Sequence, residues 1–548
     1  MVVGQRAGRV LRWVVAVAAV LGIVVPESWA SARYVPGECP PPDPRVATPY
    51  PITGYWLVPR PDRCVTRRTV EAIHGIGGDT LITFGPRLVP SAVDGAGRLL
   101  REGSVDPDFA DCVDGGRPCY LAARDAVRGR TIRQVYGYAV NELFGPALLR
   151  CPGLDRRIES RGRVYYRLLL GGSCDDSAYD LVLVATDGDG VGNLLAEAAG
   201  LGMKVFPGLP AAPQDTARPW LPDLAHLTPL DRLTERVLSD YRQRYAASPA
   251  FGGVYQSFEL AMKERPRSDP TLALYTAQHA VVAAALPGGK ILVSPYFDAR
   301  RTHGFPPGQV ARGLEEIAAT RAGAPMAIAA QDGRGTGKAP VYGADESDAR
   351  VDPRLAPMVG DVTNRQAYYG STRDYFAAAA SRPLPGVELW ANVESFEPTQ
   401  VAGECGRADP LPLRGRTAKS RIDRQVAAAA PFTAKIISYG WDPFFTCQDG
   451  FARPSLSDTL ASGWNEPIIV DASRKSVDGR DGIAVEGYNL KGGTLRFTYQ
   501  GRSVTAPLEQ RGGHAWAPFA FGDAGGAWIS VTATNGAGRS SRSGYVIR

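Results

Sequence analysis

The sequence predicts an α/β protein: a (β/α)8 TIM barrel with a disulfide-bearing insertion after its second strand, followed by a C-terminal immunoglobulin-like β-sandwich. Eight short, β-rich apolar segments recur between residues 50 and 441, and stretches long enough for a helix separate most of them. From residue 466 on, short alternating segments with Gly and Asn at the turns replace the helical patterns. A chain of 548 residues is long enough for one large domain and a smaller one.

The expected barrel strands number eight, which is the count that closes a parallel barrel. They are residues 52–58, 80–85, 204–208, 253–259, 290–297, 326–331, 387–394 and 434–441. Helical patterns fill gaps between them at residues 192–200, 230–247, 270–285 and 309–322. The alternative, an open doubly wound sheet, would carry a glycine-rich turn after the first strand, where this chain has Pro59-Arg60-Pro61.

The gap between the second and third strands holds about 118 residues, too many for an ordinary connection in a barrel. We therefore expect a folded insertion over about residues 86–200, with a hairpin formed by residues 164–170 and 180–186. Because it follows a barrel strand, this insertion is expected to cover the catalytic face. Strands at residues 468–471, 482–486, 494–499 and 527–534 predict a β-sandwich over residues 466–548.

The first 32 residues have the order of a cleavable signal peptide. Three arginines precede an apolar run at residues 13–25, and a small-residue cleavage site follows at residues 30–32. The run of 13 residues is shorter than the roughly 20 that span a bilayer. We expect a secreted, extracytoplasmic protein with no later membrane span, able to associate with the cell surface, whose barrel occupies residues 33–462.

The cysteine pattern predicts disulfides and no metal site. All eight cysteines lie beyond the expected cleavage site, and no CxxC pair of the kind that zinc requires is present. Eight cysteines allow 105 pairings. We predict that neighbours pair, namely Cys39 with Cys64, Cys112 with Cys119, Cys151 with Cys174, and Cys405 with Cys447.

Charge and glycine patterns exclude several classes of ligand. The chain is formally +6, and the part after the first 32 residues is +4, because those residues carry three arginines and one glutamate. Basic residues are dispersed among acids, so no nucleic acid partner is expected. The glycine-rich segment at residues 333–338 lacks phosphate-loop spacing and is interpreted as a plain loop. A calcium loop starting at Asp187 would need a glutamate where Ala198 stands.

Two glutamates end expected strands and form the predicted catalytic pair. Glu259 ends the fourth strand and Glu394 ends the seventh. Side chains alternate along a strand, so Glu259 shares a face with Tyr255, and Glu394 shares a face with Trp390. We expect both acids to point into the mouth at the carboxyl ends of the strands, where barrel enzymes hold their reactive groups. Paired carboxylates suit glycoside hydrolysis, in which one protonates the leaving oxygen while the other attacks or activates water. A position across the barrel fits a retaining pair at roughly 5 to 5.5 Å.

Aromatic and polar side chains near the same edge are expected to bind the sugar. The expected substrate-binding residues are Tyr55, Trp56, Tyr255, Tyr296, Asp298, Asp332, Trp390, Asn392, Tyr439 and Trp441. Trp441 is expected to be the main stacking platform. Asp298 or Asp332 is the expected substitute acid if one glutamate points away, and Glu397 is a weaker candidate.

Four phrases at these strand ends resemble the glycosidase-like TIM barrels of the family called domain of unknown function 4434. They are Gly253-Val-Tyr255 with Glu259, Val293-Ser-Pro-Tyr-Phe297, Gln331-Asp-Gly333 and Trp390-Ala-Asn-Val-Glu394. The resemblance implies that Glu259 is the acid/base and Glu394 the nucleophile. Many barrel glycosidases of the larger group have Asn before the strand-four acid, where this chain has Phe258.

The combined prediction is a secreted, retaining glycoside hydrolase that acts on a polysaccharide or cell-envelope glycan without a cofactor. Two alternatives stay open at this point. One is a catalytically inactive barrel that binds glycan, since a fold does not imply an activity. The other is an inverting enzyme that uses Asp298 or Asp332. The sugar, the linkage and the oligomeric state are not predicted.

Overall fold

The computed structural model describes residues 39–41, 43–399, 404–405, 414–448, 454–511 and 513–548. The predicted signal peptide, residues 1–32, lies outside the described residues. Residues Met1–Pro41 and Pro42–Arg548 form separate units, and the fold described below belongs to the second. Within the described residues, no helix is both long and apolar enough to cross a bilayer.

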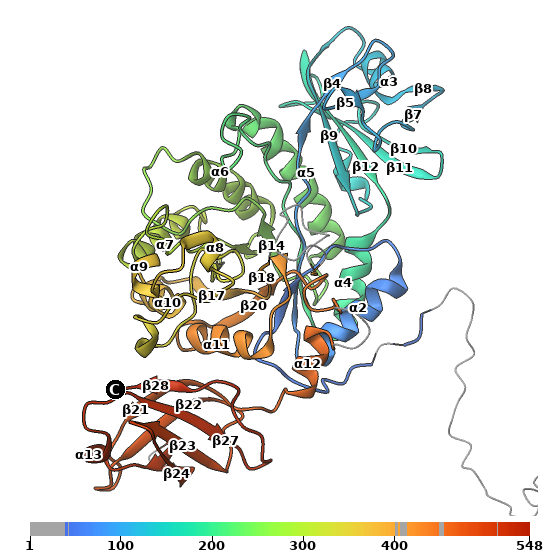
Figure 1. The fold of residues 1–548 in the computed structure, drawn as a ribbon. Coiled ribbons are helices and arrows are strands. Elements are labelled where there is room, and N and C mark those ends of the chain that lie inside the picture. The colour runs from blue at the N-terminus through green and yellow to red at the C-terminus, as the bar shows by residue number, and fades with distance from the viewer. Residues whose placement is uncertain (1–38, 42, 400–403, 406–413, 449–453, 512) are drawn as a thin grey trace, which may run out of the picture. The chain divides into compact units, whose positions relative to one another are not determined.

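Eight parallel strands form one sheet in chain order, which confirms the predicted barrel (Figure 1). They are β1 (Gly54–Trp56), β2 (Thr80–Ile82), β13 (Lys204–Phe206), β14 (Gly253–Gln256), β15 (Lys290–Val293), β16 (Met326–Gln331), β17 (Val387–Glu394) and β20 (Lys435–Tyr439). Strand β1 pairs with both β2 and β20. Parallel bridges from Val205 to Phe251 and from Gly208 to Tyr255 join β13 to β14 and close the circle.

Side chains alternate between the inside of the barrel and the layer under the helices. The inner cluster takes at least one residue from every strand: Trp56, Ile82, Phe206, Tyr255, Leu292, Ala327, Ala329, Trp390 and Ile437. Their chain neighbours, such as Leu81 and Val254, belong to the larger core that packs against the helices. This two-residue period is the constraint that sorts the candidate site residues below.

Helices lie between successive strands and surround the sheet. They are α2 (Arg63–Gly75), α4 (Gly190–Gly200), α5 (Leu227–Tyr245), α6 (Pro270–Ala285), α7 (Val310–Ala319), α8 (Ala356–Val359), α9 (Asn364–Ala367), α10 (Thr372–Ala380), α11 (Lys419–Ala429) and α12 (Leu456–Ser462). Aspartates cap several of them. Asp269 accepts hydrogen bonds from the amides of Thr271 and Leu272 and precedes Pro270, a residue suited to the first helical turn.

The insertion after β2 is a mixed five-stranded sheet in the order β10-β11-β12-β9-β3. Its strands are β3 (Val89–Pro90), β9 (Thr131–Val140), β10 (Arg156–Ser160), β11 (Arg163–Leu170) and β12 (Ala178–Thr186). Smaller elements are β4 (Ala92–Val93), β5 (Leu99–Arg101), β6 (Ser104–Val105), β7 (Val113–Asp114), β8 (Arg117–Pro118) and α3 (Cys119–Ala126). The predicted hairpin is confirmed, because Val164 pairs with Thr186 and Leu170 with Asp180.

The insertion ends before helix α4, about ten residues earlier than the predicted limit at residue 200. Helix α4 starts at Gly190, where Asp189 caps it by accepting a hydrogen bond from the Gly192 amide, and it packs against α2 and β13 of the barrel. Asp187 and Asp189, whose spacing had suggested a calcium loop, instead pair with Arg163 at 2.6 Å and Arg244 at 3.0 Å.

The insertion was expected to cover the catalytic face of the barrel, but it packs against the outer side of helix α5 instead. Strand β11 contacts α5, and Tyr166 and Leu168 join the same core as Leu230 of that helix. A buried ion pair connects the two parts, with Arg236 of α5 2.5 Å from Asp155 of the insertion. Apolar burial holds the insertion on the barrel, and the pairing leaves neither Arg236 nor Asp155 as an unpaired buried charge.

Three predicted disulfides are confirmed: Cys112–Cys119, Cys151–Cys174 and Cys405–Cys447. Cys39 and Cys64 are disulfide-bonded as well. Two of the bridges lie in the insertion, whose separate apolar core is small enough to gain from covalent restraint.

The C-terminal region consists of two four-stranded antiparallel sheets around one apolar core. One sheet has the order β21-β22-β26-β25 and the other β24-β23-β27-β28. The elements are β21 (Ile468–Arg474), β22 (Gly482–Tyr488), β23 (Thr494–Tyr499), β24 (Arg502–Pro507), β25 (Glu509–Arg511), β26 (His514–Pro518), α13 (Phe521–Ala524), β27 (Ile529–Thr534) and β28 (Tyr545–Ile547). This confirms paired antiparallel sheets, whereas the immunoglobulin-like topology stays a prediction.

A buried carboxyl group lies where the insertion meets α5. Glu142 is 5% exposed, and the hydroxyl of Tyr241 donates a hydrogen bond to it at 2.9 Å. Burial, with the nearby charges of Asp189 and Asp240, raises the pKa of Glu142 to about 8, although Tyr241 and Arg244 act in the opposite direction. The folded protein therefore holds a proton here that the unfolded chain releases at lower pH.

We predict that Glu142→Gln stabilises the protein at pH 9 and leaves its stability nearly unchanged at pH 4. A raised folded-state pKa leaves stability intact below the unfolded value of 4.5 and reduces it as the pH rises toward 8. The neutral amide removes that loss. Thermal unfolding at both pH values measures the effect, with Glu102→Gln on the exposed surface of the same insertion as control. Equal gains at pH 4 and pH 9 would contradict this explanation.

Candidate active site

The two predicted catalytic glutamates lie at the carboxyl-end side of two barrel strands that β15 and β16 separate. Glu394 is the last residue of β17, and Glu259 lies three residues beyond the end of β14, in the loop that follows. Glu394 is buried, at 3% exposure, whereas Glu259 is exposed to solvent. The open end of the barrel therefore holds one accessible and one shielded carboxylate.

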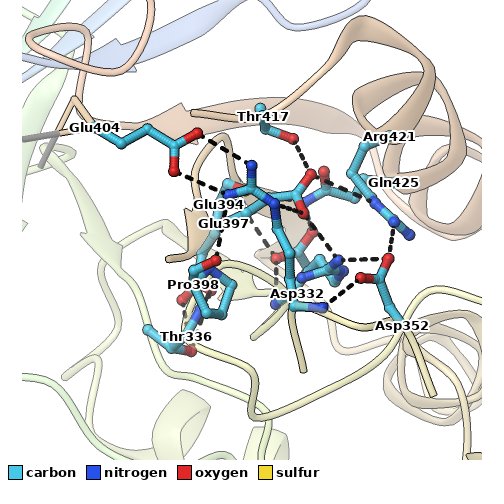
Figure 2. A network of polar contacts seen from close by, with 12 residues as sticks. Asp332, Thr336, Asp352, Glu394, Glu397, Pro398, Glu404, Thr417, Arg421 and Gln425 are labelled. Carbon is cyan, nitrogen blue, oxygen red and sulfur yellow. Dashed lines mark hydrogen bonds and ion pairs between the residues drawn. The ribbon is translucent and has the colours of Figure 1, made fainter. Parts of the chain in front are cut away.

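Glu394 is held by the glycine-rich loop that the sequence had suggested was a plain connection (Figure 2). The backbone amide of Thr336 donates a hydrogen bond to Glu394 Oε2 at 2.7 Å, and its hydroxyl donates to the same oxygen at 3.1 Å. The loop can approach Glu394 closely only because residue 335 is glycine. A Cβ there would lie 2.8 Å from Glu394 Cβ and 2.6 Å from the ring of Phe396. Donors aimed at Oε2 fix the orientation of the carboxylate.

Asp332 lies beneath Glu394 and is fully buried. It accepts a hydrogen bond from the Glu394 backbone amide at 3.2 Å and another from Gln425 Nε2 at 2.6 Å. The same Gln425 nitrogen donates to the Glu394 carbonyl at 3.1 Å (Figure 2). Burial, followed by the charge of Glu394, raises the pKa of Asp332. Asp332 thus positions Glu394 and is kept away from the solvent in the mouth.

Glu259 has the electrostatic surroundings of a proton donor. Burial of its carboxyl by the surrounding barrel raises the pKa of Glu259, and the charge of Glu394 raises it further. Lys338, Gln331 and Arg414 act in the opposite direction and lower that pKa. Glu259 therefore combines an exposed side chain with surroundings that disfavour its charged form.

Two cations lie on aromatic rings in this mouth. The ammonium of Lys338 is 3.6 Å from the centre of the Tyr296 ring. The guanidinium of Arg414, in the short strand β19 (Arg414–Gly415), is 4.5 Å from the centre of Phe396 and 5.4 Å from that of Tyr439. Contact with the ring faces holds both positive charges near the glutamates.

Glu397, the weaker candidate acid, is committed to a structural network. It begins β18 (Glu397–Pro398), accepts a hydrogen bond from Thr417 at 2.8 Å, and lies 3.2 Å from Arg334, which is fully buried. Arg421, seen beside it in Figure 2, approaches at 3.7 Å. Arg354 approaches it at 3.8 Å. These contacts occupy both oxygens of the Glu397 carboxylate and turn it toward the guanidinium groups, so the structure gives it a role in holding these segments together.

Four aromatic residues expected at the mouth lie elsewhere, and the expectation is wrong for each. Tyr55 and Trp441 face outward under the helices. The ring of Tyr55 meets that of Phe445 edge-on, and the ring of Trp441 stacks on Phe445. Trp56 and Trp390 point into the closed barrel interior and are at most 5% exposed. Outward residues and those deep in the barrel cannot reach a ligand at the open end.

The other expected binding residues divide between the interior and the rim. Asn392 is fully buried and donates to Ser294 at 3.0 Å, and Tyr255 is buried in the inner cluster. Tyr296 and Tyr439 are half-buried at the rim. Asp298 is held in an ion pair, with Arg300 2.7 Å away.

Sequence reasoning missed Thr336, Lys338, Gln425 and Arg414 as site residues. The first two belong to the glycine-rich segment 333–338, whose glycines lack the spacing of a phosphate loop. Its repeated glycines were the available signal, since alternate glycines mark a backbone that approaches other groups closely. No local sequence pattern predicts that Gln425 belongs to the site, because it reaches Glu394 from helix α11, which packs against β17.

No group of three or more His, Cys, Asp or Glu side chains is arranged to hold a metal ion within the part of the chain that the structure describes.

A protein-family model described as Domain of unknown function (DUF4434) matches residues 176–449. The match spans half of the chain and includes six barrel strands, from β13 to β20, together with both glutamates. The chain belongs to this family. A second model, described as Domain of unknown function (DUF8405), matches residues 101–184 within the insertion of this DUF4434 protein. No curated protein matches the chain.

Solved structures similar to the DUF4434 protein include three enzymes or candidate enzymes. A candidate alpha-L-fucosidase from Bacteroides thetaiotaomicron is 14% identical, with 78% of this chain and 96% of that chain covered and a TM-score of 0.40. An endo-beta-1,4-mannanase double mutant from Cellulomonas fimi is 13% identical, with 66% and 81% covered and a TM-score of 0.30. The catalytic domain of the major endoglucanase from Xanthomonas campestris pv. campestris is 12% identical, with 69% and 99% covered and a TM-score of 0.29. At these TM-scores, none bears on what the DUF4434 protein acts on.

We predict that Gly335→Ala destabilises the DUF4434 protein by about 1–3 kcal/mol, because the added methyl group forces apart Phe396 and Glu394. Urea unfolding measures the change in the free energy of unfolding. Gly308→Ala is the matched control, since a Cβ at that position meets no atom within 4 Å. A loss no larger than the control's would show that the loop does not clamp Glu394 tightly.

Proposed function

We propose that this protein is a secreted, retaining glycoside hydrolase that acts on a polysaccharide or cell-envelope glycan. The observation that carries the proposal is a pair of glutamates with different surroundings. Glu259, in the loop after β14, is exposed and has a raised pKa, whereas Glu394, at the end of β17, is held by hydrogen-bond donors. Two carboxyl groups with different environments suit the two roles of a glycosidase pair.

In the proposed reaction, protonated Glu259 donates its proton to the glycosidic oxygen while a Glu394 oxygen attacks the anomeric carbon. The bond to the leaving sugar breaks, and a glycosyl ester forms on Glu394. Glu259, now ionised, accepts a proton from water, and the resulting hydroxide oxygen attacks the anomeric carbon. The ester bond breaks, Glu394 leaves as a carboxylate, and Glu259 is again protonated.

The surroundings of the other acids favour a retaining over an inverting reaction. An inverting enzyme needs a base in contact with a water molecule in the mouth. Asp332 is fully buried and bonded to Gln425, and Asp298 is paired with Arg300. Neither offers a free carboxylate beside Glu259, whereas the charge of Glu394 acts on Glu259 directly.

Export is part of the proposal. The leader-like start and the disulfide-bonded cysteines suit an oxidising compartment outside the membrane. Glycans are abundant there, and hydrolysis needs only water as its second substrate. We further propose that residues 33–462 form the catalytic unit and that residues 466–548 pack against it or bind a surface.

We predict that Glu259→Gln and Glu394→Gln each lower hydrolysis by on the order of 10²–10⁴-fold, because each removes one of the two reacting carboxyl groups. The protein without its leader is screened against soluble β-glucan, mannan, xylan, dextran and pectin, and the release of reducing ends is measured. Glu315→Gln, on the outer helix α7, is the control and is expected to keep full activity.

Two outcomes would overturn parts of this proposal. If both glutamine variants cleave a productive glycan as fast as the parent protein, the assignment of the pair is wrong. If the parent binds a glycan in the mouth and releases no reducing ends, the barrel is a binding protein. The anomer that is first released, followed by NMR, separates retention from inversion.

We predict that Lys338→Met moves the basic limb of the pH profile of kcat/KM to higher pH. Glu259 must be protonated to act, so activity is lost as the pH rises through its pKa. The ammonium of Lys338 lowers that pKa, and its removal lets the pKa of Glu259 rise. Lys290→Met is the control, because Lys290 begins β15 at the other end of the barrel. A basic limb that stays in place, or moves to lower pH, would show that Lys338 does not act on Glu259.

A further inference from the structure

Two exposed aromatic side chains follow adjacent barrel strands and take no part in the site described above. Phe84 lies two residues beyond β2 and is 39% exposed, and Trp220 lies in the loop after β13 and is 69% exposed. Loops that follow barrel strands belong to the face on which the glutamates lie. Single exposed apolar residues need no explanation, but these two lie on loops that are hydrogen-bonded to each other.

The loops that carry them are joined backbone to backbone beyond the barrel. The amide of Leu88 donates to the carbonyl of Ala211, and the amide of Ala211 donates to the carbonyl of Pro86, both at 2.9 Å. The backbones of the two loops are in contact at Gly85 and Gly208, since a Cβ on Gly208 would lie 2.0 Å from the Gly85 nitrogen. The loops after β2 and β13 therefore form one rigid lip of the mouth.

Phe84 connects this lip to the catalytic pair. The Gly85 amide donates to the hydroxyl of Ser257 at 2.7 Å, two residues before Glu259. The ring of Phe84 lies 5.8 Å from that of Tyr439, which in turn lies 5.8 Å from Phe396, the ring that packs beside Glu394 at the glycine loop. Phe84 is thus linked to the Glu259 loop through Gly85 and Ser257, and to the surroundings of Glu394 through Tyr439 and Phe396.

Trp220 is presented at the tip of an ordered turn. Gln214 and Pro222 form an antiparallel bridge at the base of the turn, and Arg218 closes it with two hydrogen bonds to Asp215, at 2.8 and 3.2 Å. Arg87 of the neighbouring loop donates to Gln214 at 2.8 Å. Among the described residues, no ring or cation stacks on this indole. The fold therefore orders the turn while leaving a large apolar ring in water.

We propose that Phe84 and Trp220 are inner and outer stacking positions for successive sugars of a glycan chain, so that the substrate is an oligosaccharide or polysaccharide that extends from the glutamates over the β2–β13 lip. Flat aromatic faces match the apolar CH faces of pyranose rings, and a ring held rigidly before binding loses little entropy. This inference rests on the proposed function for its substrate class. It adds where the glycan chain lies and that sugars beyond the reacting one contribute to binding.

The test compares long and short substrates. Trp220→Ala is expected to lower kcat/KM on the polysaccharide that the screen identifies by about tenfold or more, the factor that about 1.4 kcal/mol of lost stacking represents. On the 4-nitrophenyl glycoside of the same sugar, which ends near the glutamates, the same variant should equal the parent. Trp220→Phe, which keeps a flat ring, should recover most of the loss. Trp528→Ala, an exposed tryptophan of the C-terminal sheets, is the matched control.

Phe84→Ala extends the test to the inner position. It is expected to impair both substrates, because Phe84 lies beside the reacting sugar. If Trp220→Ala leaves the polysaccharide reaction unchanged, or impairs both substrates equally, the outer position does not exist. Circular dichroism of each variant checks that the fold is kept.

Binding is measured separately, so that failure of hydrolysis and failure of the lip can be told apart. Affinity electrophoresis in gels that contain β-glucan, mannan, xylan, dextran or pectin uses the inactive double variant Glu259→Gln, Glu394→Gln. Retardation that Trp220→Ala abolishes and Trp528→Ala does not supports the lip, even if the parent protein cleaves nothing. Retardation unaffected by Trp220→Ala, or no retardation by any of these glycans, overturns it.

Discussion

Closure of eight parallel strands into a barrel leaves every second side chain facing inward, and only those near the carboxyl end of a strand reach the open mouth. The rest of the structure depends on this constraint. It buries Trp390 in the interior four residues before Glu394 on the same strand, and it turns Tyr55 toward the helices while its neighbour Trp56 points inward. Position along a strand therefore decides a residue's role more strongly than its chemical type does.

The catalytic candidates are positioned by groups from several distant segments. Thr336 comes from the loop after β16, Gln425 from helix α11, and Arg414 from a short strand before that helix. Each supplies either a hydrogen bond that fixes Glu394 or a positive charge that tunes Glu259. Such convergence matches the expectation that an active site needs a second layer of residues to hold its reactive groups.

Helix α5 joins the insertion to the barrel by burying two sides. It packs on neighbouring helix α6 and on strand β11 of the insertion, and both contacts share one continuous apolar core. The contact between the insertion and α5 also buries polar groups, namely the Arg236–Asp155 ion pair and the carboxyl of Glu142. The catalytic end of the barrel is instead bordered by the loops after β2 and β13, whose backbone contact requires glycine at two facing positions.

The barrel was predictable because local patterns carry the signal. Apolar strand segments, helical spacing between them and the count of eight were all visible, and β16 and β17 begin and end at the predicted residues. Strand ends were less predictable. The fourth strand stops at Gln256, because the chain leaves the sheet there to form the loop that carries Glu259.

The sequence by itself determined the barrel, the hairpin in the insertion, three of the cysteine pairings and the position of Glu394 at the end of a strand. Only the tertiary structure decided which aromatic rings face the mouth, that the glycine loop clamps Glu394, and that the insertion packs on α5. The physical reason is that spacing along the chain records the local period of a strand or helix, whereas contacts between loops depend on where barrel closure brings distant segments together.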